Sequence, residues 1–494
     1  MKRKRTIFVA VLALNAITSA CDDPEKSGFA DEDGIDRRDT EFLAECDLKY
    51  KAQVDALDFK KVGIITDLTV VEDKCRTTFD LVVWAQNNCA VGTQGRWSFW
   101  FLASQAAGTQ NVSGFILKWL ESFETQPVCN GEALTLRGDV RKWIIDPWRV
   151  KSGCAVGKKY ADDQCILKPE FAPFRLLAVV NRMDLRPDTQ NIIPNGYGGD
   201  NKDTAGEGRF VFGFLTNTGT KLRATAIFEY FLPTASKTRV QWATDWMALN
   251  GKAFGAATFN PALQAITDKF VVKGAFPGKP NSGSALNNFR TNELDFAAGT
   301  KKWSLRTFQQ KCVGMCDNNA LPLLNVGNVL TPGHEHENSL QLLEFMNKFA
   351  VDIREAKHIV PLTWDAVKFQ TCESISNPKI LTPVMWGKDL LDQQKFDDML
   401  NGPDTRRTFA IGTCSGCHYM ETDNGLIQHV IPAGKGFEAN LSLFLNPGAQ
   451  PHLVPGLGEG EPEHEFNEPR RRLCELAHTK TGAGHPLSNF FGGH

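Results

Sequence analysis

The middle of the chain groups strand-like segments before and after a pair of helix-like segments, and this order constrains the fold most. "FRLLAVVNRMDL", "GRFVFGFL" and "RATAIFEYFLP" are rich in β-branched and aromatic residues and are bounded by Gly, Asn and Pro, as strands are. Two helical patterns follow, "VQWATDWMALNG" and "NPALQAITDKFV", and then two more strand patterns, "ALNNFRTNELDF" and "KWSLRTFQ". Strands that do not alternate strictly with helices favour an α+β fold with a mostly antiparallel sheet.

Helical patterns flank this region on both sides. "RWSFWFLASQAA" and "SGFILKWLESFETQ" repeat apolar residues at three- and four-residue spacing, so we expect Trp97, Trp100 and Trp119 in the core. "ENSLQLLEFMNKFAVDIREA" predicts another helix, and Pro361 ends whatever continues beyond it. The predicted divisions are a helix-rich N-terminal segment (42–170), an α+β domain (171–310), a helical connecting segment (311–384) and a small C-terminal domain of helices and loops (385–494).

The N-terminus predicts export. "MKRKRTIFVAVLALNAITSAC" has a basic start, an apolar run and small residues before Cys21, which is the pattern of a secretory signal. The apolar run is shorter than the roughly 20 residues that span a bilayer. "TSAC" resembles the lipobox of bacterial lipoproteins, which implies a signal peptide over 1–21, acylation of Cys21 and a lipid anchor in the cell envelope, facing the periplasm or the cell surface. An ordinary secretory signal cut nearby is the alternative. Residues 22–41 are acidic and poor in large apolar residues, so we expect a flexible tether.

The cysteine count fits an exported protein. The chain has 13 cysteines, and removing Cys21 for lipid leaves an even number. An oxidising compartment favours pairing of the ten that also lie outside the C-x-x-C-H described below. The short separations favour a disulfide between Cys154 and Cys165 and another between Cys312 and Cys316.

Charge and motifs exclude several classes of function. The formal net charge is -2 and no basic cluster is present, which argues against a nucleic-acid partner. "RRRL" at 470–473 is the one concentrated basic run, and we expect it to be solvated. No nucleophile elbow, phosphate-binding loop or dinucleotide fingerprint occurs, and His334 and His336 in "GHEHEN" fit a surface loop better than a metal site. Asp184 and Arg186 end a predicted strand, where either site residues or a surface ion pair would fit.

The C-terminal region contains the motif with the clearest chemistry. In "RRTFAIGTCSGCHYMETDNG", Cys414, Cys417 and His418 spell C-x-x-C-H, the attachment signature of c-type haem. Its two thiols can meet the two vinyl groups of a haem, and the following imidazole can reach the iron from one face. With Phe409 on a short helix upstream, the segment resembles small c-type cytochromes over about the last hundred residues. The resemblance implies a covalent haem c with His418 as its proximal ligand.

The distal ligand departs from the usual cytochrome pattern, which takes a downstream Met. No methionine follows Met420, and Met420 is too close to the motif to reach around the ring. His429 is the first candidate and His452 the second. Ligation by two histidines implies a low-potential electron carrier, whereas an open position allows small ligands or peroxide chemistry. Two alternatives stay open: a disulfide or redox-active pair of the two motif cysteines, and a zinc site that adds His418 and His429 to them.

A wider resemblance covers most of the body. "PFRLLAVVNRMDLR", "GRFVFGF", "SALNNFRTNEL" and "FAIGTCSGCHYMET" together resemble a group of bacterial envelope proteins, which implies that the motif and the body form one unit but names no substrate. The leading hypothesis is an envelope lipoprotein that transfers electrons through one haem to an unidentified redox partner. A non-catalytic envelope binding protein and a haem enzyme with an open distal position are the alternatives, so the sequence does not decide whether the protein is an enzyme.

Overall fold

One antiparallel sheet of eight strands forms the centre of the part of the chain that the computed structural model describes. The described residues are 35–36, 38–108, 110–125, 128–129, 132–187, 203–277, 283–295, 303–311, 323–327, 336, 339–354, 358–371, 373–376, 402–425, 427–446, 448, 450–456 and 462–482. Seven strands follow one another across the sheet in the order β10 (Leu323–Gly327), β9 (Trp303–Lys311), β8 (Leu286–Asp295), β7 (Lys221–Pro233), β6 (Thr204–Leu215), β5 (Phe174–Arg182) and β2 (Ile64–Ile65). The eighth, β13 (Glu373–Ser376), shares an edge of β9 with β10.

The α+β class and the mostly antiparallel sheet are confirmed. Each of the five predicted strand segments forms a strand of this sheet, and the two predicted helices between them are α10 (Arg239–Ala248) and α11 (Phe259–Val271). Thr238 and Gln241 form a capping box that begins α10. From β5 to β10, each strand pairs with the next strand along the chain.

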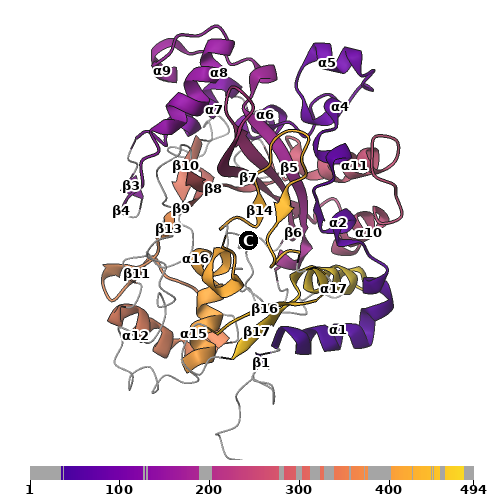
Figure 1. Ribbon diagram of the computed structural model, residues 1–494, viewed down its shortest axis with the longest axis vertical. Coiled ribbons are helices and arrows are strands. Elements are labelled where there is room, and N and C mark those ends of the chain that lie inside the picture. The colour runs from indigo at the N-terminus through magenta and orange to yellow at the C-terminus, as the bar shows by residue number, and fades with distance from the viewer. Residues whose placement is uncertain are drawn as a thin grey trace, which may run out of the picture.

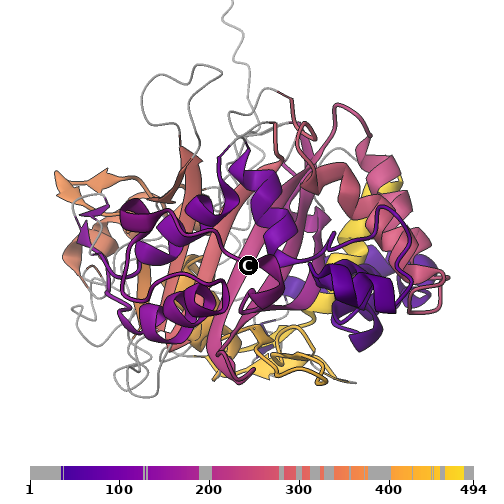
Figure 2. The same ribbon diagram turned by 90° about the horizontal axis from the view of Figure 1, so that it is seen from above.

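Helices cover one face of the sheet with an aromatic core. Side chains alternate between the two faces of a strand, so Phe210, Phe212 and Phe214 of β6 all point to this face. Phe212 meets the ring of Phe99 in α6 (Phe99–Ala107) with ring centres 5.6 Å apart, and Phe214 meets Trp119 in α7 (Val112–Glu121). Phe210 meets Phe270 of α11. Of the predicted core residues, Trp97 and Trp119 are buried, and Trp100 is partly buried against the same core. Figure 2 shows these helices lying against the sheet.

The C-terminal segment covers the other face. It contains α15 (Gly402–Ile411), α16 (Cys414–His418), the short helix η6 (Met420–Thr422), β14 (Val430–Ile431) and β15 (Asn440–Leu441). Figure 1 shows β14 in front of the sheet and α16 beside it. Val180 and Val211, on the strand face opposite the aromatic core, pack with Phe444 and Leu445 of this segment. The C-terminal segment and the sheet therefore share one apolar cluster.

The two ends of the described chain are joined beside the sheet. Helix α1 (Arg38–Asp55) packs against α17 (Glu468–Lys480), and a disulfide links Cys46 to Cys474 (Figure 1). Strand β1 (Ile35–Asp36) pairs with β17 (Glu463–Phe466), which also pairs with β16 (His452–Val454). Helix α1 begins at Arg38, so the last residues of the predicted tether are helical.

The described disulfides bear out part of the cysteine prediction. The Cys154–Cys165 bond is confirmed, and Cys75 is bonded to Cys89. Cys312 and Cys316, the predicted signal peptide and Cys21 all lie outside the described residues. Among the residues that are described, no helix is both long and apolar enough to cross a membrane.

The region predicted as one helix after residue 337 forms two helices, α12 (Leu340–Lys348) and α13 (Ala350–Arg354). Both pack with Phe409 of α15 in a separate small cluster.

The remaining elements are short: α2 (Phe59–Val62), α3 (Leu68–Val71), α4 (Lys74–Thr77), α5 (Leu81–Gln86), β3 (Val128–Cys129), β4 (Glu132–Ala133), η2 (Arg141–Ile145), α8 (Asp146–Lys151), α9 (Tyr160–Asp163), η3 (Pro169–Phe171), η4 (Met183–Leu185), β11 (Thr363–Trp364) and β12 (Val367–Lys368).

Candidate functional site

The C-x-x-C-H residues form a short, buried helix that follows α15 closely. Thr413 begins α16, because its hydroxyl accepts a hydrogen bond from the Gly416 amide at 3.1 Å. A Cβ atom on Gly416 would lie 1.9 Å from the Ala410 carbonyl oxygen, so only glycine allows the two helices to approach this closely. Cys414, Cys417 and His418 are all buried against the sheet.

The two motif cysteines differ from the other cysteines that the structure describes with their side chains. Those others form three disulfides, and neither Cys414 nor Cys417 belongs to one. The two motif cysteines therefore do not form the disulfide of the alternative interpretation. Burial raises the pKa of the Cys417 thiol, which keeps it protonated and makes it a poor redox nucleophile or thiolate ligand. Within the described ranges, no group of three or more His, Cys, Asp and Glu side chains is arranged to hold a metal ion.

The imidazole of His418 has a defined orientation. Its Nδ1 lies 2.9 Å from the carbonyl oxygen of Ile427, and since a carbonyl only accepts, Nδ1 carries the proton and donates. Asn292 lies alongside, with its amide nitrogen 3.4 Å from the same carbonyl and its oxygen accepting from Trp303 Nε1 at 2.8 Å. The lone pair of His418 is therefore on Nε2. Desolvation by burial lowers the pKa of His418 to about 4, so the ring is neutral near pH 7.

His429 lies beside the motif, as the distal-ligand prediction requires, but it does not face His418 across a gap. The two ring centres are 4.7 Å apart, and His429 Nε2 lies 3.7 Å from Cys417 Sγ while Nδ1 lies 2.8 Å from Ser442 Oγ. Two imidazoles that bind one metal ion from opposite sides place their coordinating nitrogens roughly 4 Å apart and their ring centres farther apart. Distal ligation by His429 stays a prediction and requires its ring to turn. The second candidate, His452, is directed to the Thr422 carbonyl at 2.9 Å.

A narrow cavity separates the histidines from the sheet. The cavity has a volume of about 70 Å³, which leaves room for only a few water molecules. One part of its wall is apolar and comes from strands and from the C-terminal segment: Ile64, Val180, Val211, Ile227, Leu305, Val430 and Leu445. The other part is polar and contains Arg182, Arg209, Thr225, Glu229, Arg290, Asn292, His418, His429 and Arg472.

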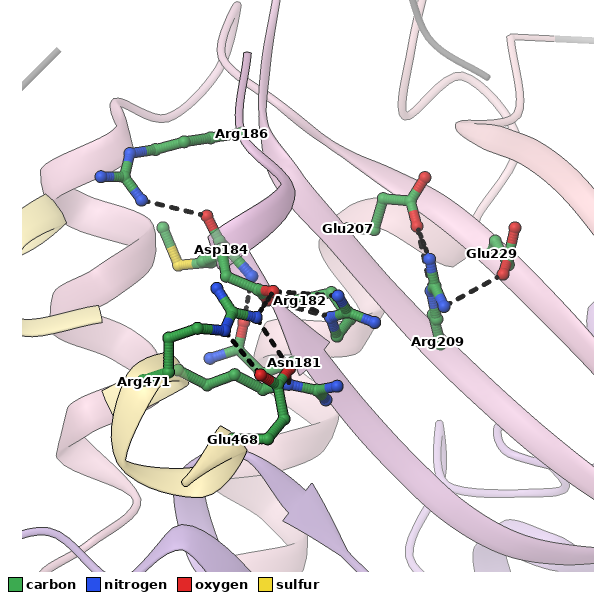
Figure 3. Close-up of polar contacts among 11 residues, drawn as sticks. Asn181, Arg182, Asp184, Arg186, Glu207, Arg209, Glu229, Glu468 and Arg471 are labelled. Carbon is green, nitrogen blue, oxygen red and sulfur yellow. Dashed lines mark hydrogen bonds and ion pairs between the residues drawn. The ribbon is translucent and has the colours of Figure 1, made fainter. Parts of the chain in front are cut away.

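A buried network of ion pairs continues from the polar wall to α17. Figure 3 shows Asp184 between Arg182 and Arg471, with a 2.9 Å contact to each, and Arg209 between Glu207 and Glu229. The side chains of these residues are at most 6 % exposed. Carboxylates and guanidiniums buried to this degree need such partners because an isolated buried charge is very costly.

The expectation that the "RRRL" run is solvated is wrong. Arg471 and Arg472 of the "RRRL" run are buried and bind Glu468, because α17 turns this face toward the sheet; Arg470 alone reaches outward, to Asp47 and Asp55 of α1. Asp184 and Arg186 follow the end of β5, where the sequence fits either site residues or a surface ion pair, and the side chains of both are buried. There Asp184 binds Arg182 and Arg471, whereas Arg186 binds Glu475 at 2.9 Å. A charged residue inside an apolar strand pattern was the signal for this network.

The electrostatics of the network are mutually stabilising. Desolvation alone would raise the pKa of Asp184, but the charges of Arg182, Arg471 and Arg472 outweigh it and the pKa is lowered. Desolvation lowers the pKa of Arg182 to about 10, which still leaves it charged near pH 7. The network is therefore ionic at the end of the sheet that faces the cavity.

Fold and site together define an α+β protein in which a buried C-x-x-C-H faces an arginine-lined cavity. The chain matches no protein-family model, no curated protein and no solved structure.

Proposed function

We propose that the protein binds one c-type haem covalently through Cys414 and Cys417, with His418 as an axial ligand, and that it transfers electrons. The observation that carries this proposal is the 2.9 Å hydrogen bond from His418 Nδ1 to the Ile427 carbonyl. Metal-binding histidines almost always donate their other ring nitrogen in this way, which fixes the tautomer and the direction of the coordinating nitrogen. His418 has this arrangement on the one helix that also carries both thiols.

The two thiols and the apolar strand residues support the proposal. Both cysteines lie outside the described disulfides, as thioether bonds to a haem require. The bound haem would supply a one-electron iron couple whose potential depends on its ligands and its burial. The apolar strand residues Val180, Val211 and Ile227 would exclude water from its surroundings, and the neutral His418 is the form that binds a metal.

A pyridine haemochrome spectrum tests the proposal. The full chain, made in a host that matures c-type haem, should give a c-type band after reduction. A Cys414→Ser/Cys417→Ser variant should lose the band, while a Cys75→Ser/Cys89→Ser variant, which loses a disulfide instead, should retain it. A matured chain without the band would contradict haem attachment.

The distal ligand and electron transfer need their own measurement. If His429 turns to bind the iron, a His429→Ala variant loses the low-spin spectrum of the parent and its midpoint potential rises. An unchanged low-spin spectrum would show that His429 is not the ligand. A potentiometric titration that shows no reversible one-electron step would contradict the electron-transfer role.

We also propose attachment to the lipid bilayer of the cell envelope through acylated Cys21. The lipobox-like "TSAC" and the acidic stretch after it support this location. Cells fed a labelled fatty acid should incorporate it into the full chain and not into a Cys21→Ser variant. Equal labelling of the two chains would contradict the anchor.

A further inference from the structure

Ile427, whose carbonyl accepts the hydrogen bond from His418, has an unusual backbone conformation. Its φ is +62°, in the left-handed region that residues branched at Cβ rarely adopt. Such a conformation is costly and persists only where the surrounding structure holds it in place. The strain therefore lies at the residue whose carbonyl orients the His418 ring.

The strained turn is anchored on the sheet. The Ile427 side chain is 3 % exposed and packs in a buried cluster with Trp303 and Leu305 of β9. The next side chain along, that of Gln428, donates to the backbone carbonyl of Asn292 in β8 at 3.2 Å. Contacts from two neighbouring strands therefore hold the turn in place.

Asn292 also contacts the strained carbonyl directly, and Trp303 decides which end of its amide does so. In the register of β8 and β9, Asn292 lies opposite Leu305, which is two residues beyond Trp303, so the three side chains share one sheet face. The indole Nε1 only donates, so the atom 2.8 Å from it must be the Asn292 oxygen. The amide nitrogen is thereby turned toward the Ile427 carbonyl, at the long distance of 3.4 Å.

This fixed amide directs the Nδ1 proton of His418 to the Ile427 carbonyl. The Asn292 nitrogen lies 3.3 Å from His418 Nδ1, and an amide nitrogen cannot accept that proton. If the amide were reversed, its oxygen would lie there instead and would compete with the carbonyl. The indole ring of Trp303 also packs beside the imidazole, with ring centres 5.5 Å apart. Both sheet residues therefore restrict the direction in which the His418 ring can point.

We infer that Asn292 and Trp303 are positioning residues, which hold the strained turn at Ile427 and thereby fix the ring direction and the protonated nitrogen of His418. This inference rests on the proposed function, in which His418 binds the iron through Nε2. Residues behind a metal ligand act in this way when they lock its tautomer and its orientation before the metal binds. The large α+β body then has a role, because β8 and β9 supply contacts that the C-terminal segment lacks.

The nitrogen that carries the His418 proton can be measured without haem, in the full Cys414→Ser/Cys417→Ser chain. Nitrogen NMR of the isotope-labelled chain near pH 7, where this ring is neutral, distinguishes the two tautomers. An imidazole free in water mostly carries its proton on Nε2, whereas we expect Nδ1 to carry it here. Asn292→Leu and Trp303→Phe should each shift His418 toward a mixture of the two tautomers, because the strained carbonyl is no longer held against the ring.

The matched controls are Asn181→Leu and Trp97→Phe. Asn181 is a buried asparagine of β5 that binds backbone groups of α2 and η4, and Trp97 is a buried tryptophan that donates to Thr267 of α11. Each control loses buried hydrogen bonds of the same kind away from the motif, so His418 should keep its proton on Nδ1. The signals of the other histidines report whether each variant keeps the fold.

Trp303→Phe retains a buried ring and decides the result if Asn292→Leu does not fold. An unchanged Nδ1 tautomer in a folded variant would overturn the positioning role, and so would an equal change in the controls. The midpoint potential of the haem-loaded chain is the second readout. It should rise in both variants and not in the controls, because a hydrogen bond from Nδ1 makes the imidazole a stronger ligand; an unchanged potential would contradict the role. A matured parent without covalent haem would contradict the proposed function, whereas the tautomer would still decide whether the sheet positions His418.

Discussion

The disulfide between Cys46 and Cys474 should contribute more to stability than the other described disulfides. It joins α1 to α17 across a sequence separation of 428 residues, whereas the Cys75–Cys89 bond closes a separation of 14. The chain-entropy relation for a cross-link gives about 6 kcal/mol for the long loop and about 3 kcal/mol for the short one at 25 °C. We therefore expect the double variant Cys46→Ala/Cys474→Ala to lose about 3 kcal/mol more than Cys75→Ala/Cys89→Ala.

Equilibrium unfolding in guanidinium chloride, followed by tryptophan fluorescence without reductant, measures both variants against the parent chain. The comparison cancels effects that are common to removing any disulfide. Equal losses in free energy of unfolding would refute the loop-entropy reasoning. A larger loss for the long loop would also identify the α1–α17 contact as the link that closes the chain around the sheet.

Three further predictions follow from single positions. Gly416→Ala should destabilise the protein by several kcal/mol, because the new Cβ would overlap the backbone of α15. Gly425→Ala is the control and should be tolerated, because a Cβ there has no neighbour within 4 Å. Equal melting temperatures of the two variants would contradict this reasoning. Glu421→Gln should cost about 3–5 kcal/mol in chemical unfolding, because it leaves the buried Arg406 guanidinium without its carboxylate at 2.8 Å, and a loss below 1 kcal/mol would contradict the importance of that pair. Desolvation lowers the pKa of His358 from 6.5 to about 4 in the folded protein. As the pH drops, His358 of the unfolded chain is therefore protonated before that of the folded chain. The free energy of unfolding falls between pH 6.5 and about 4, by at most about 3 kcal/mol. His358→Phe should flatten the pH profile of unfolding, and an unchanged profile would show that this group does not titrate as described.

The main sheet could be predicted because its signals are local. Each strand from β5 to β9 has a run of β-branched or aromatic residues between turn residues, and each pairs with its neighbour in sequence. β10 and β13 were missed because they are short and pair along an edge of β9 with no such run. The start of α1 was missed because the acidic sequence there indicates a tether, whereas packing against α17 and the Cys46–Cys474 bond favour a helix.

The candidate site was predictable only in part, for the same physical reason. The C-x-x-C-H and the nearby His429 are recognisable from 16 consecutive residues, and the structure does bring them together. The buried network of ion pairs depends on contacts such as that of Asp184 with Arg471, which are 287 positions apart and leave no local pattern. Charged residues are exposed in most proteins, so the "RRRL" run predicts a solvated surface. The packing of α17 instead buries two of its arginines.

The mass of the denatured chain tests the central claim most directly. Chain matured in a host that attaches c-type haem is denatured in acid, separated from any non-covalent ligand and weighed by mass spectrometry, together with the Cys414→Ser/Cys417→Ser variant. The account predicts that the parent chain carries the added mass of one haem and that the variant carries none. A parent chain with the bare polypeptide mass, or a variant that still carries the haem, would contradict covalent attachment at this motif.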